Sequence, residues 1–137
     1  MEVLSSAGRE SLTWVSSDPQ KGQRISLEVE GLRLGYTIFD PYVAILNDKK
    51  FELVTCDDSP LAIQDPHASI IAPEDGTYFI EVRDSSYAGN DGAQYRMHVG
   101  AFPRPTVAYP AGGKAGSELS VTYLGDPAGP LTETIKV

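Results

Sequence analysis

Hydrophobic and polar residues alternate along short stretches of the chain, as they do in β-strands that cover a core with one face. The clearest stretch is Arg24–Glu30, where every second residue is apolar. Residues 78–83 and 94–99 alternate in the same way. The apolar positions of the three stretches are Ile25, Leu27, Val29, Tyr78, Ile80, Val82, Tyr95, Met97 and Val99. Helical periodicity is nearly absent, so the pattern predicts an all-β chain.

Shorter apolar runs are typical of strands that are more buried than these. They cover residues 42–46, 53–56 and 69–72, and a run at 12–16 is expected to supply the first strand. Turn-forming residues separate the runs; they are Lys21-Gly22, Asn47-Asp48, Glu74-Asp75-Gly76 and Asn90-Asp91-Gly92. This spacing predicts an antiparallel β-sandwich of the jelly-roll kind. Residues 31–40 show no clear period and are either helical or extended.

The composition changes at Phe102-Pro103-Arg104-Pro105. Because proline cannot donate a ladder hydrogen bond, this segment is a linker or an edge strand. Two further strands are expected at 106–109 and 119–123, around a glycine-rich loop. The segment 104–137 is shorter than the roughly 40 residues that usually fold alone. The sequence therefore predicts a β-sandwich domain at 1–103, and at 104–137 a linker and a truncated immunoglobulin-like fragment.

Negative charge dominates the chain and excludes one class of partner. Its 137 residues include 19 acidic and 11 basic side chains, for a net charge of -8. Phosphate backbones would be repelled by such a surface, so nucleic acid is not an expected partner. A membrane partner is not expected either, because no apolar run has the roughly 18 residues of a transmembrane helix. Residues 1–9 lack the pattern of an export signal, and the chain is expected to begin inside a longer protein.

The acidic residues are most crowded between Asp57 and Asp91, where Arg83 is the sole base. Carboxylates at this density repel one another unless a cation or backbone donors intervene. Many of them fall in predicted loops, where calcium finds oxygen ligands most easily. The best candidates for a calcium site are Asp57, Asp58 and Asp65, joined by Asp84 and Asp40 if their loops meet at one end of the sandwich. The alternative is that these carboxylates cap turns and keep the surface soluble.

Catalytic patterns are weak in this sequence. Cys56, the single cysteine, excludes an intrachain disulfide and lacks the neighbouring cation that would activate it, so a buried or half-buried strand residue is expected. His98 falls on the polar face of its strand and His67 follows a proline in a predicted turn. Ser59 has no Gly-x-Ser-x-Gly motif around it. We therefore predict that the chain is not an enzyme.

Three tyrosines, Tyr36, Tyr42 and Tyr87, lie in or beside predicted loops. Tyrosine rings combine a flat apolar face with a polar edge, so they could form a surface on which sugars or peptides stack. The alternative is that they pack in the core or at its rim.

Five segments in order carry a family resemblance. They are Lys21-Gly22-Gln23-Arg24, Asp40-Pro41, Asp57-Asp58, Ala72-Pro73-Glu74-Asp75-Gly76-Thr77-Tyr78 and Tyr95-Arg96-Met97-His98-Val99. Together they resemble the bacterial pre-peptidase C-terminal domain, over residues 12–101. The continuation through Phe102-Pro103-Arg104-Pro105 and Tyr109-Pro110-Ala111-Gly112-Gly113 is similar to large exported multidomain proteins of bacteria such as planctomycetes.

The resemblance implies a jelly-roll-like sandwich appended to secreted peptidases and other exported proteins, with no catalytic residues of its own. Related collagen-binding modules of bacterial collagenases hold calcium and contact extracellular polymers. Those modules draw several calcium ligands from an acidic N-terminal linker, whereas residues 1–11 supply only Glu2 and Glu10 here.

We thus expect a non-catalytic accessory or binding module of a secreted or periplasmic protein, with calcium as its candidate cofactor. Its expected partners are the neighbouring domains of the parent protein and an extracellular protein or polysaccharide. Two alternatives stay open. One is a structural spacer, and the other is a hydrolase of unrecognised type that uses Asp57, Asp58 or His67.

Overall fold

The chain folds almost entirely into antiparallel β-strands. The computed structural model describes residues 2–6, 11–13, 19–36, 38–88 and 92–137, and for 2–6 and 11–13 it describes the backbone. The elements are β1 (Glu2–Ser6), β2 (Ser11–Thr13), β3 (Arg24–Glu30), the 3-10 helix η1 (Leu32–Leu34), β4 (Pro41–Leu46), β5 (Glu52–Cys56), β6 (His67–Ile71), β7 (Phe79–Asp84), β8 (Gln94–Gly100), β9 (Val107–Tyr109), β10 (Glu118–Leu124) and β11 (Leu131–Lys136). The all-β prediction is confirmed.

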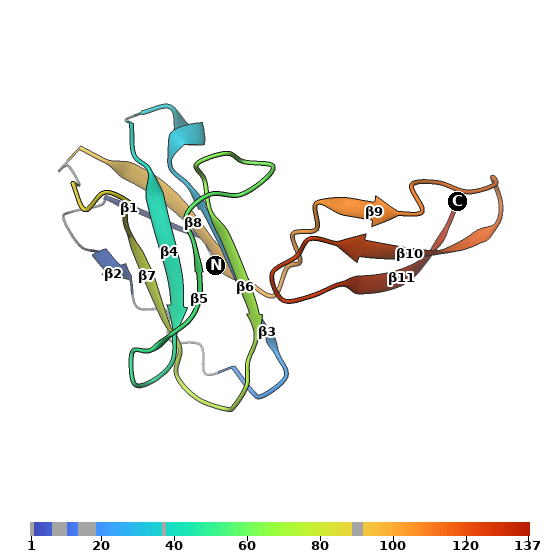
Figure 1. The fold of residues 1–137 in the computed structure, drawn as a ribbon, viewed down its shortest axis with the longest axis horizontal. Helices are drawn as coiled ribbons and strands as arrows, with labels where there is room; N and C mark the ends of the chain where they lie inside the picture. The colour runs from blue at the N-terminus through green and yellow to red at the C-terminus, as the bar shows by residue number, and fades with distance from the viewer. Residues whose placement is uncertain (1, 7–10, 14–18, 37, 89–91) are drawn as a thin grey trace. The chain divides into compact units, whose positions relative to one another are not determined.

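The chain divides into two compact units, Met1–Phe102 and Pro103–Val137. The first unit contains two four-stranded sheets, with strand orders β1-β8-β3-β6 and β2-β7-β4-β5. All neighbouring strands in these sheets are antiparallel. Between β1 and β8 the chain changes sheet at every connection except the β4–β5 hairpin, and Figure 1 shows the resulting layers. This wrapping of eight strands over two sheets is a jelly roll, as expected.

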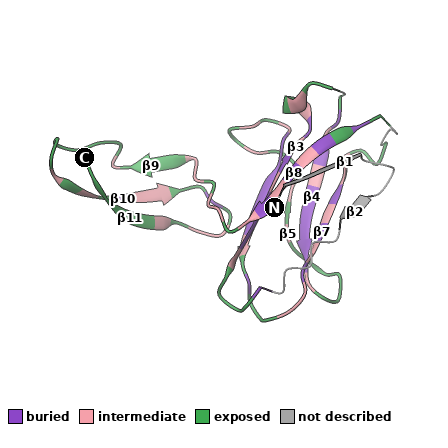
Figure 2. Ribbon diagram, turned by 180° about the vertical axis from the view of Figure 1, so that it is seen from behind, coloured by how far each residue is buried: buried purple, intermediate pink, exposed green. Residues whose placement is uncertain are grey.

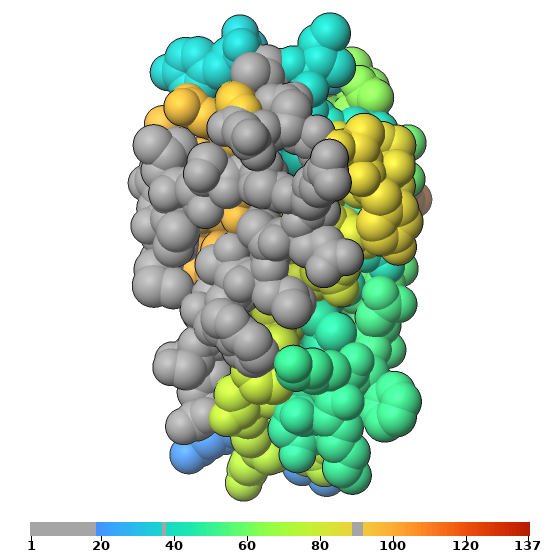
Figure 3. All heavy atoms as spheres, turned by 90° about the vertical axis from the view of Figure 1, so that its left-hand side faces the viewer, coloured from blue at the N-terminus to red at the C-terminus, as the bar shows by residue number. Residues whose placement is uncertain are grey.

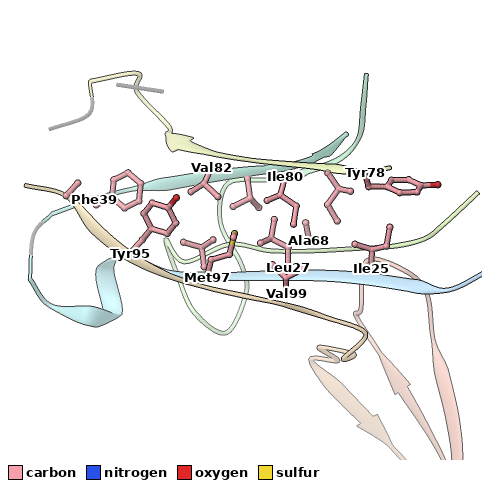
Figure 4. Close-up of a cluster of buried hydrophobic side chains, with 14 of the residues drawn as sticks. Ile25, Leu27, Phe39, Ala68, Tyr78, Ile80, Val82, Tyr95, Met97 and Val99 are labelled. Carbon is pink, nitrogen blue, oxygen red and sulfur yellow. The ribbon is translucent and has the colours of Figure 1, made fainter. Parts of the chain in front are cut away.

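The core lies between the two sheets and includes every side chain that the alternating stretches predict to be buried. All nine apolar positions of the three alternating stretches are buried, together with Phe39, Val43, Ile45, Ala68, Ala72 and Ala93. Figure 4 shows these side chains pointing toward one another from the two layers. The buried residues run along the middle of the strands of the first unit (Figure 2). Burial of this apolar surface is the main stabilising contribution to the sandwich.

Some elements differ from the sequence-based expectation. The run 53–56 was expected to be a more buried strand, but β5 is an edge strand that, in the described part of the chain, pairs with β4 alone, and Leu53 is 39% exposed. β6 begins at His67, so this residue lies in a strand and not in a turn. Residues 31–40 begin with η1 and end by inserting Phe39 into the core. β1 and β11 were not predicted at all.

Two predicted features fall partly on residues outside the described ranges. The expected first strand at 12–16 overlaps β2, which ends at Thr13, and residues 14–16 are not described. The predicted turn at residues 90–92 is described at Gly92 alone. None of the helices that the structure describes is long and apolar enough to traverse a bilayer.

The second unit is a three-stranded antiparallel sheet with the order β11-β10-β9. Asp126 is buried and accepts hydrogen bonds from the backbone N–H of Arg104 at 2.7 Å and of Ala128 at 2.8 Å. These bonds tie the entry of the unit to the turn between β10 and β11. The immunoglobulin-like character of this fragment stays a prediction.

Candidate functional site

The five aspartates of the predicted calcium site lie at one end of the first unit. β3, β5 and β7 run toward this end, and the ladder pairs Pro41 with Asp84 and Val43 with Cys56. In the described part of the chain, the connections that meet there are residues 31–36 with 38–40, residues 57–66, and residues 85–88 with 92–93, which we call the loop end (upper part of the sandwich in Figure 1). The topology therefore supplies the common end that the calcium hypothesis required, although it does not by itself bring the carboxylates together.

Both carboxylate oxygens of Asp65 accept hydrogen bonds that join two of these connections. Its side chain is 1% exposed, and one carboxylate oxygen, Oδ1, accepts the backbone N–H of Gly31 at 2.9 Å and of Leu32 at 2.8 Å. The other oxygen, Oδ2, accepts the backbone N–H and the Nε–H of Arg33, at 3.2 and 2.6 Å. Arg33 also bonds Glu28 at 2.9 Å. Asp65 thus replaces the N-terminal caps that η1 lacks, which is a structural role.

Asp84 has a similar local role in the turn that follows β7. Its Oδ1 accepts the backbone N–H of Ser86 at 3.0 Å and of Ala88 at 3.3 Å, and also the hydroxyl of Ser86. Burial by itself would raise the pKa of this carboxyl, but the hydrogen bonds from Ser86, Ala88 and the Asp40 backbone outweigh it and lower the pKa below its ordinary value. Asp84 therefore fixes the conformation of residues 84–88.

The remaining three aspartates interact with one another by charge. The carboxylate of Asp40 accepts the Ser85 hydroxyl at 2.7 Å through Oδ2, and its buried Oδ1 has no hydrogen-bond partner among the described residues. Partial burial raises the pKa of Asp57, and the negative charges of Asp40 and Asp58 raise it further. Among the residues that the structure describes, no three His, Cys, Asp or Glu side chains are grouped as metal ligands would be. The calcium prediction thus rests on Asp40, Asp57 and Asp58.

Cys56 lies in β5, His67 in β6 and His98 in β8. Cys56 is half-buried in β5, and burial raises the pKa of its thiol, as do Asp57 and Asp58 to a smaller extent. His67 is buried with its ring centroid 6.4 Å from that of Phe102. The strand register aligns His67 and His98 on either side of Glu28, a row that sequence spacing could not show.

A stack of two tyrosines and an arginine covers the adjoining outer face of the β2-β7-β4-β5 sheet. The guanidinium carbon of Arg83 lies 3.6 Å from the ring centroid of Tyr42 and 4.1 Å from that of Tyr87. Arg83 lies opposite Tyr42 in the β4–β7 ladder, and Tyr87 follows in the turn that Asp84 holds. Tyr36 is not in this stack as the structure describes it. The sequence offered the three tyrosines as a stacking face, but the packing of Arg83 between two of them was missed.

A polar cleft lies at the opposite end of the sandwich. Its volume is about 300 Å³, and it is lined by Asn47, Asp48, Lys49 and residues 74–78. The lining residues belong to two turns, the β4–β5 turn and the connection from β6 to β7. In the second turn, Asp75 accepts the backbone N–H of Lys21 at 2.6 Å, and the Tyr78 hydroxyl donates to the Glu74 carbonyl at 2.8 Å. None of the residues proposed for calcium or for catalysis lines this cleft.

Comparisons of the chain with protein-family models, with curated proteins and with solved structures found no match.

Proposed function

We propose that the first unit is a non-catalytic accessory module of an exported bacterial protein, and that it binds an extracellular protein or polysaccharide through the loop end. The observation that carries the proposal is that the carboxylates of Asp65 and Asp84 accept hydrogen bonds from backbone N–H groups of residues 31–33 and 86–88. Loops held in one conformation lose little entropy on binding, which favours a recognition surface. The ordered family motifs at residues 21–99 give further support to this role.

The hydrolase alternative has less support. It needs Asp57, Asp58 or His67 to converge on a reactant. Asp57 and Asp58 are exposed at the loop end, whereas His67, the first residue of β6, is buried with its ring near that of Phe102. The polar cleft, which could hold a small reactant, involves none of the three.

The proposal is tested by sedimentation of the full chain with insoluble polymers, namely fibrillar collagen, peptidoglycan, chitin and cellulose. We expect at least one polymer to retain the chain. Asp57→Lys, which reverses a charge at the loop end, is expected to change the retained fraction, because charges beside an interface act on binding. The matched control is Asp48→Lys, an equally exposed aspartate at the opposite end. Retention by none of the polymers would favour the structural-spacer alternative.

Calcium is the second component of the proposal, with Asp57 and Asp58 as its ligands. Both side chains are exposed and can rotate toward a cation, and a cation would relieve the repulsion that raises the pKa of Asp57. For an extracellular module with a millimolar dissociation constant, about ten times that concentration of calcium adds roughly 1.4 kcal/mol of stability. We expect the melting temperature to rise by about 5 °C relative to chelator.

Asp57→Asn separates calcium binding from simple charge relief. A carboxyl whose pKa is raised by folding destabilises the folded state when ionised, and this effect disappears as the pH falls through the raised pKa. In chelator at about pH 7 the variant should therefore melt above the unsubstituted chain, and at about pH 3 the two should melt together. Calcium should raise the melting temperature of Asp57→Asn by less than it raises that of the unsubstituted chain or of Asp48→Asn. Equal melting of the unsubstituted chain in calcium and chelator would remove calcium from the proposal.

A further inference from the structure

The stack of Tyr42, Arg83 and Tyr87 is built as a rigid unit on the sheet, and we call it the stacking platform. Tyr42 lies along β4, because its hydroxyl donates to Glu52 at 3.1 Å, and Glu52 pairs with Leu46 four residues farther along the strand. Ala44, which lies between these positions on the same face, is fully buried as a result. Tyr42 is therefore the base of the platform.

Arg83 is fixed between the two rings by its own polar contacts. One guanidinium nitrogen, Nη1, donates to the carbonyl oxygens of Asp84 at 3.2 Å and Ser85 at 3.4 Å. Its Nε lies 3.4 Å from a carboxylate oxygen of Glu81. Its guanidinium carbon lies over both tyrosine rings, 3.6 Å from the centroid of Tyr42 and 4.1 Å from that of Tyr87. A cation enclosed in this way holds both rings in place.

Tyr87 is held in an uncommon backbone conformation. Its φ is 58°, in the left-handed region that residues other than glycine rarely adopt. Its backbone N–H donates to the Asp84 carbonyl at 3.0 Å. Left-handed backbone at such a residue costs about 1 kcal/mol or more, so the surrounding hydrogen bonds must maintain it. The result is a ring that is positioned by the turn and yet is 63% exposed.

Tyr87 is exposed over most of its surface. Figure 3 shows the segment around residues 84–88, in yellow, standing at the surface of this side of the unit, with residues 47–56 in green below it. Large aromatic rings normally bury most of their surface. A ring that is both positioned and exposed is typical of a site where a second flat, apolar face stacks.

Electrostatics limits what can stack there. Arg83 already occupies the inner face of Tyr87, and this cation weakens the attraction of the ring for a second cation on the outer face. Anionic ligands are disfavoured by the negative charge of Asp57, Asp58 and Asp84, which lie at the same end of the unit. The platform therefore fits a neutral ligand with a flat apolar face and hydroxyl donors at its edge, and these are the properties of a pyranose ring.

We propose that the stacking platform binds a neutral polysaccharide, with one sugar ring stacked on the outer face of Tyr87. This inference rests on the proposed function and names the ligand class of the loop end. Exposed carboxylates at the same end of the unit, such as Asp57, are available to accept hydrogen bonds from the sugar hydroxyls.

Affinity electrophoresis of the full chain tests the inference. The gels contain soluble neutral polysaccharides (a mixed-linkage β-glucan, a xylan and a galactomannan) or anionic polygalacturonate, and a parallel titration uses an arginine-rich peptide. We expect at least one neutral polysaccharide to retard the chain. Tyr87→Gly should weaken this binding about tenfold without loss of folding, because glycine adopts φ of 58° without strain. Tyr87→Phe should bind normally. Phe51→Ala removes a similarly exposed ring, 67% exposed, from the β4–β5 turn at the opposite end of the sandwich, and should leave the binding unchanged.

The outcomes separate this inference from the proposed function. Binding that Tyr87→Gly leaves unchanged, or binding of polygalacturonate or the peptide alone, would overturn the saccharide inference and leave a binding module. Failure of the chain to bind all of these ligands, and also the insoluble polymers, would overturn both.

Discussion

Replacing Asp65 by alanine is expected to lower the free energy of unfolding of the first unit by about 3–5 kcal/mol. The carboxylate is buried and accepts four hydrogen bonds from Gly31, Leu32 and Arg33. Its removal leaves backbone donors without partners and takes from the Arg33 guanidinium one of its two carboxylates, the other being Glu28. Domains of this size are stable by about 5–15 kcal/mol, so the variant should lie close to its unfolding threshold. Urea denaturation followed by circular dichroism measures the loss.

Two further variants show whether the loss comes from these bonds. Asp65→Asn keeps the shape and one acceptor oxygen, and should therefore lose less than the alanine variant. Asp58→Ala removes an exposed carboxylate from the same connection and should change the free energy of unfolding by less than about 0.5 kcal/mol. If Asp65→Ala were no less stable than Asp58→Ala, the role assigned to Asp65 would be wrong.

Phe39→Ala is expected to cost a similar amount, about 3–5 kcal/mol. Phe39 is 1% exposed and stacks on Tyr95 with ring centroids 5.9 Å apart. It anchors the connection 31–40 in the core, and Gly31 passes so close that a Cβ there would lie 2.9 Å from the Phe39 ring. Truncation leaves a cavity at the loop end that this connection can fill only by moving.

The matched control for this prediction is Phe51→Ala. Phe51 is 67% exposed in the β4–β5 turn, so its truncation should change the free energy of unfolding by less than about 0.5 kcal/mol. Urea denaturation of both variants provides the comparison. Equal costs for the two phenylalanines would contradict the burial of Phe39 between the sheets.

The sandwich could be predicted from the sequence because its core side chains alternate locally. The alternation of Ile25, Leu27 and Val29 with polar residues predicts a strand with one buried face before any partner strand is known. The exposure of β5 could not be predicted in this way, because an apolar run does not show whether a strand has one neighbour or two. A buried strand and an edge strand with one packed face both contain residues such as Val54 and Cys56.

The site was predictable in composition and not in arrangement. The crowding of Asp57, Asp58, Asp65 and Asp84 in loops is visible in the sequence, and all of them lie at the loop end. The partners of Asp65 are backbone N–H groups more than 30 residues away, which carry no side-chain signature. The pairing of Arg83 with Tyr42 was also not predictable, because it depends on the register between β4 and β7, which alternation alone leaves undetermined.

The most direct test of a binding surface at the loop end is a nuclear magnetic resonance titration of the ¹⁵N-labelled chain with oligosaccharides of the polymer that retards it. We expect amide shifts to change at residues 83–88, at Tyr42 and at residues 52–58, with the oligosaccharide recovered intact. Shift changes centred on the polar cleft of Asn47–Lys49 and Glu74–Tyr78, or conversion of the oligosaccharide into products, would contradict this account of the protein.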